Sequence, residues 1–175
     1  MLSFEVEFLI DLLKVYSPTG QEAELAKILC SKMRDLGFEA YIDPVGNVIG
    51  ELKGKGPKVL LCGHMDTVPG FIPVRIEKEE IWGRGAVDAK GPLATLVLAA
   101  KKYVALSKEG LNIVVAGVVE EEGSSKGMYY LIDTMEEPEI AVFGEPSGAS
   151  CLTLGYKGSV TFEVTIETEG GHSAS

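Results

Sequence analysis

Three apolar runs of this chain each lead into a histidine or a group of acidic residues. The runs cover residues 59–62, 113–119 and 140–143, and they are followed, in order, by His64 with Asp66, Glu121 with Glu122, and Glu145. Short apolar runs rich in β-branched residues are typical of buried strands. In an open α/β sheet, ligands bind beyond the carboxyl ends of the strands. The pattern therefore predicts an α/β fold that gathers these side chains at one rim.

The residue types at this predicted rim favour a metal site. Several carboxylates gathered in one place repel each other unless a cation neutralises them, and a histidine among them favours zinc. Taken alone, His64 is more often a packing or capping residue. The three consecutive glutamates can also be a solvated charge run at a helix N-terminus. That reading suits Glu120 but not Glu121 and Glu122, because a seven-residue apolar run precedes them.

The remaining pattern predicts helices that alternate with strands. Helices are expected over 4–16, 91–106 and 124–133, with a further helix that runs from a capping box at Thr19 and Glu22 to Gly37. Strands are expected over 38–42, 48–52, 58–62, 74–78, 81–82, 113–119 and 140–143. This order predicts a mixed, largely parallel sheet flanked by helices.

The texture of the chain changes after Glu145. Apolar and polar residues alternate from Val160 to Glu167, which is typical of a half-exposed strand in an antiparallel sheet. We therefore place a domain boundary near Tyr156, with one domain over 1–155 and the first strand of another over 156–175. The apolar stripe of this last segment predicts that it is either poorly anchored or associates with another chain.

Composition limits the function classes. With 16 basic and 26 acidic residues the net charge is −10, which argues against nucleic acid and anionic membrane as partners. The three cysteines show no paired spacing and are expected to be free thiols in a reducing cytoplasm. No apolar stretch is long enough to span a membrane, and the acidic N-terminus does not have the basic start of a signal peptide.

Five motifs in order carry a family resemblance. They are GHMDTVP at 63–69, GRGAVDAKG at 83–91, EEEGS at 120–124, GEPS at 144–147 and GGHS at 170–173. Together they resemble the dinuclear zinc hydrolases of the acetylornithine deacetylase and succinyl-diaminopimelate desuccinylase family, which includes aminoacylases and carboxypeptidases. Within that family the closest likeness is to the lysine-biosynthesis hydrolases that release lysine or ornithine from an amino-group carrier protein.

The resemblance implies a zinc ligand set. His64 and Glu145 resemble the private ligands of one zinc, Asp88 the bridging ligand, and Glu122 a ligand of the second zinc. Two zinc ions per full-length subunit are implied, with cobalt as a substitute. The resemblance also implies a cis peptide bond between Asp88 and Ala89.

Three catalytic roles follow from the same resemblance. Asp66 resembles the carboxylate that orients His64 and fixes its tautomer. Glu121 resembles the general base that moves a proton from the attacking water to the leaving amine. His172 resembles a histidine of the lid domain that reaches the partner subunit's active site and stabilises the oxyanion.

The resemblance is to the N-terminal part of the family chain. The family's last zinc ligand is a histidine near the end of a chain about twice this size, whereas His64 and His172 are the only histidines here. We therefore expect a chain truncated at the start of an α+β lid and dimerisation domain, from a protein that is a homodimer when full-length. The expected activity is hydrolysis of an N-acyl amino acid, or of lysine or ornithine linked to a carrier. The alternatives are a zinc-dependent small-peptide carboxypeptidase or dipeptidase, and an inactive metal-binding fragment.

Overall fold

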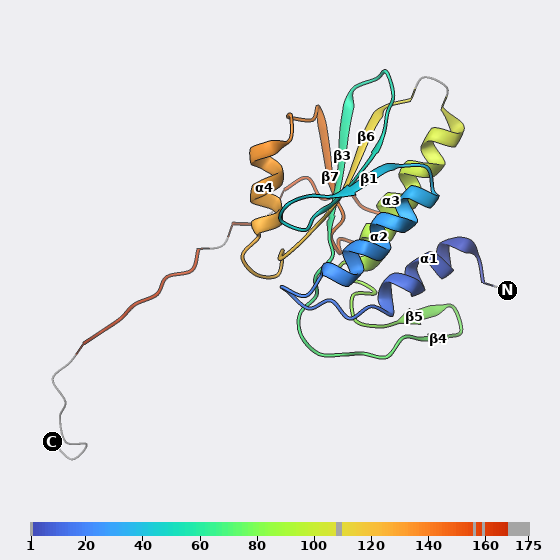
Figure 1. The fold of residues 1–175 in the computed structure, drawn as a ribbon. Coiled ribbons are helices and arrows are strands. Elements are labelled where there is room, and N and C mark those ends of the chain that lie inside the picture. Colours follow the sequence, from blue (N-terminus) through green and yellow to red (C-terminus); the bar gives the residue numbers. More distant parts are fainter. Residues whose placement is uncertain (1, 108–109, 156, 159, 168–175) are drawn as a thin grey trace, which may run out of the picture.

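A five-stranded sheet with helices on both faces forms the centre of the molecule (Figure 1). The structure is a computed structural model that describes residues 2–107, 110–155, 157–158 and 160–167. The strands lie in the order β1-β2-β6-β3-β7, and β4 and β5 form a separate two-stranded sheet. Among the described residues, no helix is both long enough and apolar enough to cross a membrane.

The parallel part of the sheet carries the strand ends that matter for the site. The strands are β1 (Glu39–Ile42), β2 (Val48–Leu52), β3 (Lys58–His64), β4 (Arg75–Glu77), β5 (Glu80–Trp82), β6 (Asn112–Val118) and β7 (Ile140–Phe143). Strand β3 lies between β6 and β7 and is parallel to both, whereas β1 and β2 are antiparallel to their neighbours. The prediction of a mixed sheet flanked by helices is confirmed.

Two hydrophobic cores lie on opposite faces of the sheet. Helices α1 (Phe4–Leu13), α2 (Ala23–Asp35) and α3 (Lys90–Leu106) pack on one face, where their apolar side chains meet those of β2 and β6. Helix α4 (Lys126–Thr134) packs on the other face, where Leu131 meets Leu60, Val114 and Ala116. Figure 1 shows α4 apart from the three other helices. Burial of these faces is the main force that holds the sheet between the helices.

Strand β7 differs from the expectation of a buried strand. Its side chains are exposed, with Ile140 at 51% and Phe143 at 49%. The reason is its position, because β7 pairs with β3 on one side only and is an edge of the described sheet. An apolar run therefore predicted the strand correctly and its burial wrongly.

The segment over 160–167, expected as the first strand of a second domain, pairs with no strand in the described part of the chain. These residues have no regular secondary structure, and Val160, Phe162, Val164 and Ile166 are 76–81% exposed. A strand is stable only when its backbone groups pair with a neighbouring strand, and no described strand lies beside this segment (Figure 1). Tyr156, at the expected boundary, lies outside the described residues.

Candidate metal centre

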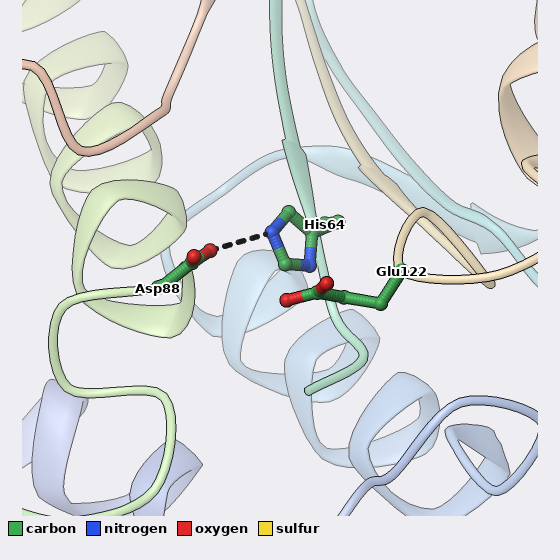
Figure 2. Close-up of side chains that lie close together, drawn as sticks. All are labelled: His64, Asp88 and Glu122. Carbon is green, nitrogen blue, oxygen red and sulfur yellow. Dashed lines mark hydrogen bonds and ion pairs between the residues drawn. The ribbon is translucent and has the colours of Figure 1, made fainter. Parts of the chain in front are cut away.

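The carboxyl ends of the parallel strands bring the predicted residues to one rim. His64 is the last residue of β3 and stands opposite Val118, the last residue of β6, so the loops after both strands leave the sheet at the same edge. Asp88 reaches this edge from the turn before α3. Ligand atoms of His64, Asp88 and Glu122 all lie within 4.8 Å of one another, and Figure 2 shows their side chains converging.

The two ring nitrogens of His64 have different partners. Nδ1 lies 2.9 Å from the backbone oxygen of Asp66 and 3.3 Å from its Oδ1, while Nε2 lies 3.0 Å from Oδ1 of Asp88. Burial opposes protonation of the ring, but the hydrogen bond to Asp66 and the charge of Glu145 raise the pKa of His64 to about 9. A proton on Nδ1 is held by Asp66, which leaves Nε2 as the atom that faces the acids.

Two further acids surround the same nitrogen. Oε2 of Glu121 lies 3.9 Å and Oε1 of Glu145 lies 4.0 Å from Nε2 of His64. The structure thus brings together every site residue that the sequence predicts up to Glu145. His172 lies outside the described residues.

The cluster carries more negative charge than its own residues balance. Partial burial and the negative charge of Asp88 raise the pKa of Glu122. Burial raises the pKa of Glu145, and the negative charge of Glu121 raises it further. The effect of His64 is opposite but smaller than their sum. A divalent cation removes this repulsion. Imidazole and carboxylate donors at this spacing are the ligands that zinc and related cations use, so the residues fit such a cation.

Asp66 is fully buried and holds the loop that follows β6. Its Oδ1 accepts a hydrogen bond from the amide of Glu121 at 3.0 Å. Its Oδ2 accepts from the amide of Glu122 at 3.1 Å and from the hydroxyl of Thr19 at 2.9 Å. Burial disfavours the ionised form, but the hydrogen bonds from His64, Thr19 and these amides lower the pKa of Asp66. The carboxylate therefore positions both the imidazole and the two glutamates.

A buried lysine two residues after Asp88 ties the start of α3 to the end of α1. The peptide bond between Asp88 and Ala89 is cis, as the resemblance implied. Lys90 is 1% exposed, and its ammonium donates to the backbone oxygens of Val15 at 2.6 Å and Leu12 at 3.4 Å. Burial lowers the pKa of Lys90 to about 8. A cation in the first turn of a helix opposes the helix dipole, so Lys90 is in an unusual position. That position was the sequence signal that Lys90 has a structural role, which the sequence analysis missed.

A second missed residue is Asn47, which is fully buried in the turn between β1 and β2. Its side-chain amide donates to Oδ2 of Asp43 at 2.8 Å and to the backbone oxygen of Gly127 at 2.9 Å. Its carbonyl oxygen accepts from the amide of Val119 at 3.0 Å. Asn47 thereby holds both ends of the loop over 120–126. Gly127 must be glycine, because a Cβ there would lie 2.3 Å from Oδ1 of Asn47.

The capping box expected at Thr19 and Glu22 is wrong. Helix α2 begins at Ala23, its N-cap residue is Glu22 with a helical backbone, and no side chain caps the first amides. Thr19 donates instead to Asp66, and Glu22 accepts from the amides of Gly20 and Glu120. The two side chains hydrogen-bond residues around the acidic cluster instead of the first amides of the helix. Local sequence spacing does not reveal these partners.

A cavity of about 380 Å³ opens beside the acidic cluster. His64, Glu121 and Glu145 are among its lining residues, and so are the apolar residues Met128 and Phe143. The cavity thus combines apolar residues of β7 and α4 with acids of the cluster. A concave site with a mostly apolar lining and a few polar groups is typical of small-molecule binding sites.

The match to a family model decides the classification. The model described as peptidase family M20/M25/M40 matches residues 60–174, which include all of the described site residues from His64 onward. The chain belongs to this family. The predicted resemblance to dinuclear metal hydrolases is thereby confirmed at the level of the family.

Curated relatives within the M20/M25/M40 family match almost the whole chain. A Pyrococcus furiosus protein to which a LysW-lysine/LysW-ornithine hydrolase activity is ascribed is 52% identical, over 99% of this chain and 52% of its own length. The LysW-lysine hydrolase of Deinococcus radiodurans is 40% identical, over 96% of this chain and 47% of its own length. The chain thus spans about half the length of these relatives.

Solved structures of the M20 family share the fold. The M20 family metallo-carboxypeptidase of Sulfolobus solfataricus aligns with a TM-score of 0.73 at 22% identity, over 82% of this chain and 37% of that chain. A Staphylococcus aureus tripeptidase aligns with a TM-score of 0.71 at 23% identity, over 82% of this chain and 43% of that chain. At this level of identity the likeness supports the fold.

Proposed function

We propose that the whole protein is a zinc-dependent amide hydrolase that releases lysine or ornithine from a carrier protein. One observation carries the proposal: ligand atoms of His64, Asp88 and Glu122 meet within 4.8 Å, with Glu121 and Glu145 beside them. The family is one of metal-dependent peptidases, and relatives that are 40–52% identical are named as hydrolases of LysW-linked lysine or ornithine.

The residues divide into two ligand sets. His64, Asp88 and Glu145 would hold one cation, and Asp88 with Glu122 would hold the second. When bound, two divalent cations supply Lewis acidity that polarises a scissile carbonyl and acidifies water. Asp66 keeps Nε2 of His64 turned toward the acids of the cluster by holding Nδ1.

Glu121 is the carboxylate placed to act as the general base. Its side chain is 44% exposed and faces the cavity, whereas its amide is fixed by Asp66. A carboxylate so placed takes a proton from the attacking water and returns it to the leaving amine. The leaving amine is then expelled as the free amino acid.

The remaining sequence-based predictions belong to the same proposal. His172 would stabilise the oxyanion from the segment after the boundary near Tyr156. The whole protein would act as a homodimer in the cytoplasm. Neither nucleic acid nor membrane is needed as a partner, in keeping with a net charge of −10.

The test is a comparison of three amide substrates with the whole protein. We expect the largest kcat/KM for lysine linked by an amide to its carrier protein, a smaller value for N-acetyl-lysine and the smallest for an unmodified dipeptide. A chelator should abolish all three activities and Zn²⁺ should restore them. If the dipeptide is cleaved fastest, the protein is a peptidase. If no amide is cleaved with zinc present, the proposed chemistry is wrong.

A further inference from the structure

The carboxylate of Glu22 joins two segments that are far apart in the sequence. It is 5% exposed, and its Oε1 accepts hydrogen bonds from the amide of Gly20 at 2.9 Å and the amide of Glu120 at 3.1 Å. A buried carboxylate is costly unless hydrogen bonds compensate it. Hydrogen bonds to an ionised acceptor are roughly twice as strong as neutral ones. The hydrogen bond from the amide of Glu120 therefore attaches the turn after β6 to the start of α2.

Three consecutive amides of that turn are held by two buried carboxylates. Glu22 accepts from the amide of Glu120, and Asp66 accepts from the amides of Glu121 and Glu122. Glu120 has a φ of 55°, in the left-handed region that non-glycine residues rarely adopt. The chain turns sharply there, and its backbone oxygen accepts from the amide of Ser125 at 2.7 Å. A turn in this conformation needs external partners for its amides.

The two carboxylates belong to one frame. Thr19, three residues before Glu22, donates its hydroxyl to Asp66, and its amide donates to the backbone oxygen of Thr67 at 3.3 Å. The amide of Thr67 donates in turn to the backbone oxygen of Ser17 at 3.0 Å. The segment over 17–22 and the residues after β3 are thus tied together beneath the turn. A displacement of this segment would move both acceptors at once.

We propose that Glu22 is a positioning residue that sets the metal affinity of the site by fixing the turn that carries Glu121 and Glu122. The inference rests on the proposed function, because it takes Glu122 as a metal ligand. Glu22 does not touch the cluster itself. It acts by holding the amide that begins the turn, in the way that outer partners orient metal ligands in other sites.

The test is the affinity for Zn²⁺ of metal-free protein, measured by competition with a chelator. Glu22→Met keeps the length of the side chain but removes the acceptor, and Glu22→Asp keeps the charge but shortens the reach. Each is expected to weaken Zn²⁺ binding by about 10- to 100-fold. Glu22→Gln should recover most of the affinity, since both bonds are accepted by one oxygen and an amide carbonyl can replace it.

Glu24 provides the matched control on the same helix. Its side chain is 68% exposed, and among the described residues its one ion pair is with Lys27, at 3.9 Å, so Glu24→Met should bind Zn²⁺ as the wild type does. The Co²⁺-loaded protein gives a second readout, because a displaced ligand changes its visible spectrum. If either Glu22→Met or Glu22→Asp folds and binds Zn²⁺ with wild-type affinity, the inference is wrong. If Glu22→Gln binds as weakly as these two, it is also wrong. Wild-type protein that binds no Zn²⁺ would instead contradict the proposed function.

Discussion

Replacing Glu121 by glutamine in the whole protein should lower kcat by about 100- to 10,000-fold, the range for loss of a general acid or base. The glutamine keeps the size of the side chain but takes up no proton from the attacking water. Metal content should stay at the wild-type level, because Glu121 is assigned no ligand role. A steady-state activity assay measures kcat, and metal analysis of the same sample measures the metal content.

Glu122→Gln is the comparison that separates the two neighbouring glutamates. Its ligand atom lies within 4.8 Å of those of His64 and Asp88, so this variant should lose metal as well as activity. Glu24→Gln, on the exposed face of α2, should change neither. If Glu121→Gln loses metal and Glu122→Gln keeps it, the two roles are reversed.

Replacing Asp66 by asparagine should lower the free energy of unfolding of the metal-free protein by about 3 kcal/mol, the loss typical of breaking a buried charged network. The new amide group places a donor where Asp66 now accepts from Glu121, Glu122 and Thr19. At least one of these donors then has no acceptor at the fully buried side chain of residue 66. The side-chain contact to Nδ1 of His64 is altered as well, which leaves the ring held by the backbone oxygen alone, so Zn²⁺ affinity should fall too.

Urea denaturation of metal-free wild type and variant measures this loss. Asp133→Asn is the control, because Asp133 lies exposed on α4. Surface substitutions of this kind usually change stability by less than about 0.5 kcal/mol. An Asp66→Asn protein as stable as the Asp133→Asn protein would show that the carboxylate does not hold the turn.

The sequence predicted that the side chains of the candidate site meet, because the ends of strands place most of them. Apolar runs that end at His64, Glu121 and Glu145 belong to parallel strands whose carboxyl ends share one edge, so their order along the chain was enough to bring the acids together. Asp88 follows no strand, and only the family motif identified it. The structure places it 3.0 Å from His64.

The errors arise where tertiary contacts decide the outcome. Thr19 and Glu22 have the spacing of a capping box, but Glu22 accepts instead from the amide of Glu120, a contact that no local pattern encodes. The run over 140–143 predicts a buried strand, but burial depends on what lies beside β7. The strand over 160–167 stays a prediction, because the alternation gives the period of a strand without specifying a partner, and no described strand pairs with it.

The central claim is that Asp88 holds metal together with His64 and Glu145 on one side and Glu122 on the other, and a zinc measurement on an Asp88 variant tests it most directly. The side chain of Asp88 is 53% exposed, so Asp88→Ala should leave the fold intact. Wild-type protein should retain zinc through dialysis against a weak chelator, and Asp88→Ala should bind it at least about 100-fold more weakly, more than the loss of an outer partner would cause. Zinc retention that is equal in the two proteins, or absent from the wild type, would contradict the account.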